Sequence, residues 1–295
     1  MQNSTLFSGE SRDARCVFQS DPAFPAGLFR LSRPPKALWV AGNLPAESVK
    51  RVVIVGARDA TGAACAKARD MAERLSKAGM AVLSGGAFGI DAAAHEGALA
   101  GGSPTYAVLG CGVDVVYPDR HAALFSRIGQ RGGLISEFPL GTPPRARQFP
   151  SRNRILAALG EAVIVVQAAI RSGSLITAKE ATAMGIPVYA VPGSAGTDML
   201  LAGRRAYPIF RSDQVLDTLM GKSRGAERLV PDHAVHTMGT LLTVLAEGMG
   251  TPEGLSSRLG QPLSSILALL AEAELEGFVR RAGGNHYEVI GRASC

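Results

Sequence analysis

The stretch RVVIVGARDATGAACAKARDMAERLSKAGMAVLSGGAFGIDAAAH, residues 51–95, decides the fold. It begins with a run of Val and Ile at 52–55, continues as an Ala-rich helical pattern over 61–79, and returns to a short apolar run at 80–84. Apolar runs without polar alternation are typical of strands buried on both faces, as in parallel sheets covered by helices. The stretch therefore predicts an α/β unit with a parallel sheet.

The same alternation extends through most of the chain. Further strand-like runs are PTYAVLG (104–110), GGLISE (132–137), AVIVVQ (162–167), PVYAVPG (187–193) and AYPIF (206–210), with helical patterns between them. Together they predict a doubly wound, mostly parallel, Rossmann-like sheet. Residues 21–43, which carry four prolines, are expected to pack against this sheet, so that an extended Rossmann-like domain spans 21–220. Residues 1–20 are polar and aperiodic, and we expect a flexible tail.

The C-terminal part has a different pattern. Residues 221–236 are polar and patternless, which predicts a linker. Residues 237–291 read as three helices and a β-hairpin whose turn is GGN at 283–285, the order of a winged helix. Thr251 is expected to cap the second of these helices, with Pro252 at its first position.

Composition limits the class of protein. Lys and Arg number 31 against 25 Asp and Glu, a formal net charge of +6 that permits attraction to phosphate polymers. The cysteines, Cys16, Cys65, Cys111 and Cys295, are too scattered to predict a zinc site or a disulfide framework, and a cytoplasmic location is expected. No signal peptide is recognised, and every apolar run is shorter than about 18 residues, so no membrane insertion is expected.

Three predicted turns lie at the carboxyl edge of the sheet. Arg58 follows the first strand, Ser84, Gly85 and Gly86 follow the second, and Ser172, Gly173 and Ser174 lie between AVIVVQ and a helix. Backbone amides and hydroxyls at such turns, next to helix N-termini, are suited to binding phosphate. Each turn alone is also compatible with an ordinary connection. The three together indicate an anion site.

The segment PPRARQFPSRNR, residues 143–154, is the most informative about a ligand. Arg145, Arg147, Arg152 and Arg154 surround Phe149, and no acidic side chain interrupts them. Guanidinium groups that contact phosphates beside a ring that stacks on a base are typical of single-stranded nucleic-acid sites. The alternative is an ordinary solvated loop with Phe149 in the core.

Catalytic chemistry finds little support in the sequence. Asp91 and His95 are four residues apart on a predicted helix and could form a metal or acid/base pair, but we favour a structural role because no third ligand is near. A nucleophile elbow and a Walker A lysine motif are both absent from the sequence. We therefore predict no catalytic residue, no metal and no cofactor.

The motifs also support a family resemblance. VGARDATG, LSGGAFGIDAAAHEGAL, VLGCGVDVVYP, LISEFPLG, FPSRNRILAAL, SGSLITAKEA and VYAVPG resemble, in order and spacing, the signatures of the DprA/Smf family. The resemblance implies a non-enzymatic, homodimeric protein of natural transformation that protects incoming single-stranded DNA and helps to load the recombinase RecA. It also implies a DNA pocket formed by Arg58, the Ser84 to Gly86 turn, Phe149, Arg152, Asn153, Arg154, and Ser172 to Ser174.

The chain departs from the family pattern at a few positions. A basic residue of the family falls on Ala146, although Arg145 and Arg147 flank it. Gln167 stands where the family carries an acid, and the loop after Gly193 is short. These departures affect inferences about dimer geometry and RecA contact more than those about fold.

Two other functions fit the sequence less well. A Rossmann-type enzyme similar to the LOG nucleotide phosphoribohydrolases would carry PGGxGTxxE, whereas residues 192–200 read PGSAGTDML. A transcriptional regulator would read duplex DNA with the helix at 262–277, but PLSSILALLAEAELEG lacks Arg, Lys, Asn and Gln. Single-stranded DNA binding is the function that we expect.

Overall fold

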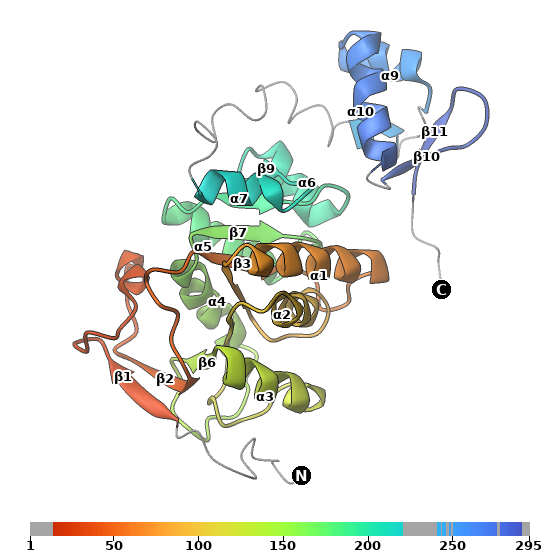
Figure 1. Cartoon of the computed structure of the whole chain (residues 1–295). Helices are drawn as coiled ribbons and strands as arrows, with labels where there is room; N and C mark the ends of the chain where they lie inside the picture. The colour runs from red at the N-terminus through yellow and green to blue at the C-terminus, as the bar shows by residue number, and fades with distance from the viewer. Residues whose placement is uncertain are drawn as a thin grey trace.

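The computed structural model describes residues 14–220, 241–242, 244–245, 248, 250–275 and 278–290. In this part of the chain the larger sheet has nine strands in the order β1-β2-β6-β5-β4-β3-β7-β8-β9 (Figure 1). The strands are β1 (Arg15–Phe18), β2 (Ala37–Gly42), β3 (Arg51–Val55), β4 (Ala81–Ser84), β5 (Thr105–Val108), β6 (Gly133–Ser136), β7 (Ala162–Val165), β8 (Val188–Ala190) and β9 (Tyr207–Pro208). The strands from β3 to β9 run parallel, which confirms the predicted doubly wound, Rossmann-like fold.

Helices cover both faces of the sheet. They are η1 (Ala26–Arg30), α1 (Gly62–Lys77), α2 (Ile90–Gly101), η2 (Asp119–His121), α3 (Ala122–Arg131), α4 (Gln148–Leu159), α5 (Ser174–Ala183), α6 (Ala195–Ala202) and α7 (Asp213–Leu219). Val52 and Ile54 of β3 pack in the cluster that includes α1 and α2, whereas Val53 and Val55 pack in the cluster that includes α4 and α5. Because successive side chains of a strand point to opposite faces, this double burial explains the unbroken apolar run of β3.

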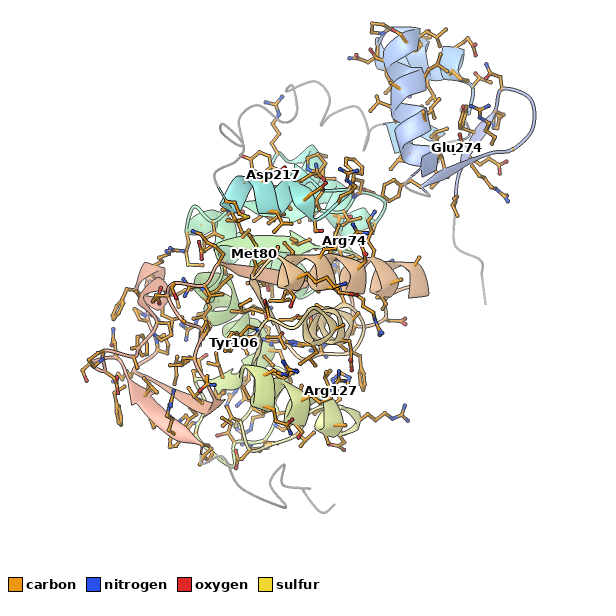
Figure 2. All side chains as sticks on the ribbon, in the orientation of Figure 1. Arg74, Met80, Tyr106, Arg127, Asp217 and Glu274 are labelled. Atoms are coloured by element: carbon orange, nitrogen blue, oxygen red, sulfur yellow. The ribbon has the colours of Figure 1, made fainter. Side chains whose placement is uncertain are left out.

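The outer surfaces of the helices are polar. Figure 2 shows side chains filling the space between the sheet and the helices, with Arg74 on α1 and Arg127 on α3 at the outside. Arg74 pairs with Asp70 one helical turn away, and Arg127 reaches Glu96 of α2 at 2.8 Å. Such exposed pairs contribute little to stability, so the packed sheet faces carry the fold.

The N-terminal part differs from the prediction. The expected tail of residues 1–20 is wrong for Arg15–Phe18, which form β1 and pair antiparallel with β2. Strand β2, in turn, pairs antiparallel with β6, so residues 37–42 join the sheet rather than pack against it. Only Val17 of β1 is buried, and one buried residue in four gives no periodic signal. Residues 1–13 lie outside the described part.

The C-terminal module contains α9 (Pro252–Leu259), α10 (Leu263–Leu275), β10 (Val279–Arg281) and β11 (Tyr287–Val289). The two strands pair antiparallel around the predicted glycine turn, and the Thr251 hydroxyl caps α9 by accepting from the Gly254 amide at 3.2 Å. Four described residues of the first expected helix, Leu241, Leu242, Val244 and Leu245, are buried in the core of the module. The predicted linker, 221–236, lies outside the described residues.

One aromatic side chain of the module contacts the larger domain. The Phe278 ring lies 6.1 Å, centroid to centroid, from the Phe210 ring that follows β9. The Lys67 ammonium of α1 lies 4.9 Å from the centroid of the Phe278 ring. Over the described residues, no helix combines the length and the apolar character that crossing a bilayer requires.

Candidate nucleic-acid interface

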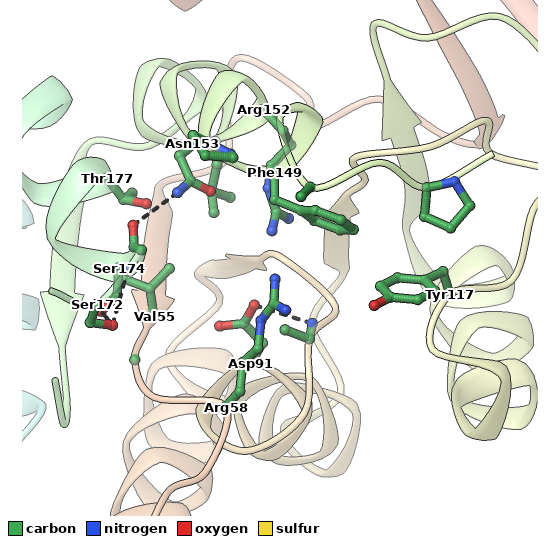
Figure 3. A pocket seen from close by; sticks show the side chains of 17 residues that line it. Val55, Arg58, Asp91, Tyr117, Phe149, Arg152, Asn153, Ser172, Ser174 and Thr177 are labelled. Carbon is green, nitrogen blue, oxygen red and sulfur yellow. Dashed lines mark hydrogen bonds between the residues drawn. The ribbon is translucent and has the colours of Figure 1, made fainter. Parts of the chain in front are cut away.

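A cavity of about 470 Å³ lies at the carboxyl edge of the sheet (Figure 3). From β3 the chain proceeds to β4 on one side of the sheet, and β7 pairs with β3 on the other, so the strand order switches at β3. Ligands of open α/β sheets bind in the crevice outside such a switch point. The cavity walls come from the loops after β3, β4 and β7 and from helices α4 and α5.

One end of the cavity is aromatic. Phe149, at the start of α4, has the Arg58 guanidinium carbon 5.1 Å from its ring centroid, and the Tyr117 ring lies 5.4 Å away. A Cβ at Gly110 would lie 2.9 Å from the Phe149 ring, so the glycine makes room for it. Phe149 is half-buried and Arg58 is exposed. The expected association of Arg58 with Phe149 is thus present in the structure.

The other end carries hydroxyl groups. The Ser172 and Ser174 hydroxyls lie 2.7 Å apart at the start of α5, and the Asn153 side-chain amide donates to the Gly173 carbonyl at 2.9 Å. Thr177, one turn into α5, is 1% exposed and lines the cavity, yet its hydroxyl has no hydrogen-bond partner. A buried hydroxyl without a partner costs free energy, which a ligand that accepts a hydrogen bond there would recover.

Arg152 lies between the two ends of the cavity, where hydrogen bonds to backbone carbonyls fix its side chain. Its guanidinium donates to the Gly85 carbonyl at 2.6 Å and to the Val108 carbonyl. Burial raises the pKa of Asp91, and the nearby Arg152 charge opposes that shift. Burial likewise lowers the pKa of Arg152, but a guanidinium remains protonated at neutral pH. Arg152 therefore supports the cavity floor as a buried cation beside a buried carboxylate.

The loop after β4 differs from the expectation for it. A Cβ at Gly85 would overlap the Arg152 guanidinium and the Asp91 carboxylate, so the space that the glycine frees is filled by protein groups rather than opened to phosphate. Ser84 is fully buried and donates to the Ile54 carbonyl at 2.6 Å. Gly86 has φ +73 and its carbonyl contacts the His121 imidazole. Ser84 has no exposed surface with which to touch a ligand, contrary to the expectation, whereas Gly85 makes room for Arg152 and its contact with a ligand stays a prediction.

The remaining arginines of the basic segment lie away from the cavity. Arg154 pairs with Glu137, donates to the Arg33 carbonyl at 2.9 Å and does not line the cavity, so its contact with DNA stays a prediction. Arg145 and Arg147 are exposed, but only the residue between them, Ala146, lines the cavity.

His95 is placed for the structural role that the sequence favoured, whereas Asp91 is buried but lines the cavity. His95 is fully buried and its Nδ1 lies 2.8 Å from the Thr105 hydroxyl, which itself donates to the Val82 carbonyl. Thr105 must then accept from Nδ1–H, which fixes the neutral tautomer. Burial, with the nearby His121 and Arg152, lowers the pKa of His95 to about 3. No group of three or more metal-ligating side chains occurs among the described residues.

Sequence reasoning missed two cavity residues and one contact beside it. Tyr117 lies in a loop between β5 and α3, and Thr177 lies inside α5. Both fall within quoted motifs, VLGCGVDVVYP and SGSLITAKEA, but outside the glycine and arginine positions that indicated a site. The Gln167 side-chain oxygen accepts from the Thr61 amide at 3.0 Å and thereby ties the end of β7 to the start of α1. The signal for Tyr117 was its position after an apolar run at the carboxyl edge.

This combination defines a Rossmann-type protein with a ligand crevice at its switch point, lined by an arginine-flanked ring and a hydroxyl-bearing helix start. The chain belongs to the DNA recombination-mediator protein A family, whose family model matches residues 15–220. The resemblance to the DprA/Smf family is thereby confirmed.

Individual relatives agree with this assignment. Protein Smf of Escherichia coli is 32% identical over 92% of this chain and 76% of its own length. A solved structure of DNA processing protein A from Streptococcus pneumoniae superposes with a TM-score of 0.66 at 34% identity, covering 70% of this chain and 75% of that one. The Helicobacter pylori structure, described by its single-stranded DNA binding mode, gives 0.64 at 29% identity, covering 73% and 100%.

Proposed function

We propose that this protein binds single-stranded DNA in the cavity at the switch point and acts in DNA processing during natural transformation. The carrying observation is the Phe149 ring at one end of the cavity, with the Arg58 guanidinium 5.1 Å and the Tyr117 ring 5.4 Å from its centroid. A ring flanked by a guanidinium can stack on a base while the arginine contacts the adjoining phosphate. The structure of the Helicobacter pylori relative, which concerns its single-stranded DNA binding mode, supports the same function.

The shape of the cavity favours a single strand over a duplex. About 470 Å³ at a sheet edge accommodates one nucleotide or little more, and a base must leave its stack to reach Phe149. In a duplex that displacement costs pairing and stacking energy. The hydroxyls of Ser172, Ser174 and Thr177 lie at the other end, where they can donate to phosphate oxygens.

A salt titration tests this function. Fluorescent oligo-dT should bind more tightly than a duplex of the same length, and its affinity should fall with salt with a log–log slope of about −0.7 per phosphate contact. Arg58→Ala should make the slope shallower by about that amount, whereas Arg127→Ala, a surface arginine paired with Glu96, should leave it unchanged. An identical slope in wild type and Arg58→Ala would contradict the proposed pocket.

The proposal extends to the activity, oligomeric state and partner of the protein. We infer a binding protein without catalytic activity, which protects incoming DNA, forms a homodimer and assists the loading of RecA in the cytoplasm. Asp91 is the acid among the residues that line the cavity, and it lies buried beside Arg152 with no second lining carboxylate to form an acid/base pair, which supports a non-catalytic role. Size-exclusion light scattering measures the oligomeric state, and base release from nucleoside monophosphates would contradict the non-enzymatic part.

A further inference from the structure

A smaller recess of about 40 Å³ adjoins the cavity, and its walls include an exposed aromatic side chain that the site so far does not use. Phe88, in the loop between β4 and α2, is 42% exposed, and Tyr117 across the recess is 39% exposed. The recess shares Arg58, Tyr117 and Phe149 with the main cavity, so the two are continuous. Large exposed rings beside a binding cavity are candidates for ligand contact rather than packing.

The Phe88 ring is held in place by the surrounding structure. It meets the His121 ring edge to face at 4.7 Å, and His121 is anchored by the Gly86 carbonyl at 3.0 Å. On the other side, Gly89 has φ +72, and a Cβ there would overlap the Ala57 carbonyl, so the backbone turn is fixed. A ring that is already fixed loses little conformational freedom when a ligand stacks on it.

The walls of the recess favour a polyanion as the occupant. They contain two arginines, Arg58 and Arg152, and no carboxylate. Arg58 also lies over Phe149, so one guanidinium borders both the main cavity and the recess. A strand whose base stacks on Phe149 would carry its next nucleotide past Arg58 toward this recess.

We propose that Phe88, with Tyr117, forms a second base-binding position that receives the nucleotide adjoining the one stacked on Phe149. This inference rests on the proposed function, because it requires a single strand in the main cavity. It adds a second stacking platform, so this edge of the protein grips two consecutive nucleotides. The ligand class is a single-stranded oligonucleotide of at least two residues.

The test compares oligonucleotide lengths on the full chain. Oligo-dT from two to about twelve nucleotides is titrated against wild type, Phe88→Ala, Phe88→Leu, Phe149→Ala and the control Phe29→Ala, an exposed ring on η1. Phe149→Ala should weaken binding at every length. Phe88→Ala and Phe88→Leu should weaken it by about 5- to 100-fold, since both remove the ring face. Phe29→Ala should match wild type.

A position-specific probe locates the effect. Single 2-aminopurine substitutions along the oligonucleotide should show stacking-dependent quenching at two adjacent positions in wild type, of which Phe88→Ala loses one and Phe149→Ala loses the other. Equal melting temperatures of the variants exclude misfolding as the cause. Wild-type affinity and two quenched positions in Phe88→Ala would overturn the second position. A wild type that binds no oligonucleotide would instead overturn the proposed function.

Discussion

Two turns at the same sheet edge have similar sequences and opposite roles. SGGAFGID, residues 84–91, and RSGSLITA, residues 171–178, each place small residues between a strand and a helix. In the first, Arg152 and Asp91 fill the space that Gly85 provides. In the second, the Ser172 and Ser174 hydroxyls and the unpartnered Thr177 hydroxyl contribute to the cavity wall. We call them the filled turn and the exposed turn.

The difference shows what local sequence leaves undetermined. A Gly-rich turn before a helix supplies space and amides, but a side chain from elsewhere decides whether that space remains for a ligand. Here the side chain comes from α4, whose Arg152 bonds to Gly85, 67 residues earlier. Substitutions at Gly85 and Arg152 should therefore act on stability, and substitutions in the exposed turn on binding.

The largest effect is expected for Arg152→Ala. Removing the guanidinium leaves the buried carbonyls of Gly85 and Val108 without their donor, which typically costs about 1–3 kcal/mol of unfolding free energy for each group left unsatisfied. Urea denaturation measures the loss, and Arg58→Ala, an exposed arginine, is the control that should stay close to wild type. If Arg152→Ala lost DNA affinity at unchanged stability, Arg152 would be a ligand contact and the filled turn would be misassigned.

A second effect concerns acid stability. The folded pKa of His95, about 3, lies below its unfolded value near 6.5, so the unfolded state binds the extra proton first as pH falls. The contribution of His95 to the free energy of unfolding is fully present above about pH 6.5. Below that pH it falls by about 1.4 kcal/mol per pH unit, a total loss of about 2 kcal/mol at about pH 5.

Replacing His95 by Gln should remove this decline. The raised pKa of Asp91 acts in the opposite sense, so the informative quantity is the difference between wild type and His95→Gln at each pH. Denaturant midpoints from pH 7.5 to about 5 measure it. Parallel pH profiles for the two proteins would show that His95 is not held neutral.

For the exposed turn, stability and binding should change in opposite directions. Thr177→Val removes a buried hydroxyl that has no partner, so the free protein should be as stable as wild type or more stable, by up to about 1 kcal/mol. Oligo-dT affinity should fall about fivefold, because one donor to the strand is lost. Thermal melting and titration of the same sample measure both. A parallel loss of stability and affinity would place Thr177 with the filled turn.

The smallest effect is expected at Ala146, which lies outside both turns and tests whether the strand passes this part of the cavity wall. Ala146 lines the cavity between two exposed arginines that do not. Ala146→Lys should raise oligo-dT affinity a few-fold at low salt and steepen the salt slope by about 0.7, the signature of one added phosphate contact. Lysine at the neighbouring exposed position, Arg147→Lys, keeps the charge and should change neither. An unaltered slope in Ala146→Lys would mean that the strand does not pass this wall.

The sequence predicted the fold and the aromatic end of the site well. Buried apolar runs such as Val52–Val55 have few alternatives to a strand covered on both faces. Arg58 followed from its position at the sheet edge and Phe149 from the basic segment, while their meeting in one pocket was implied by the family resemblance. Sequence reasoning grouped Arg152 and Arg154, but they lie two residues apart on α4 and point in different directions. Each residue of a helix is rotated by about 100° from the one before it, so two arginines that are close in the sequence can lie on opposite sides of the helix.

Other features left no local signal. Strand β1 has a single buried side chain, and its pairing with β2 depends on residues some 20 positions away. In the sequence Thr177 looks like any other helix residue. Only the packing of α5 against the cavity shows that its buried hydroxyl has no hydrogen-bond partner.

Because Gly85 and Arg152 approach each other closely, the residues at these two distant positions should change together in evolution. A side chain at 85 would require the ends of the Arg152 and Asp91 side chains to move, since they occupy the volume that its Cβ would take. Related chains that carry a larger residue at the first position should therefore have shortened the second, and should have neutralised the acid that it accompanies. Correlated substitutions at positions 85 and 152 among related chains would then show where the floor of the cavity has been repacked.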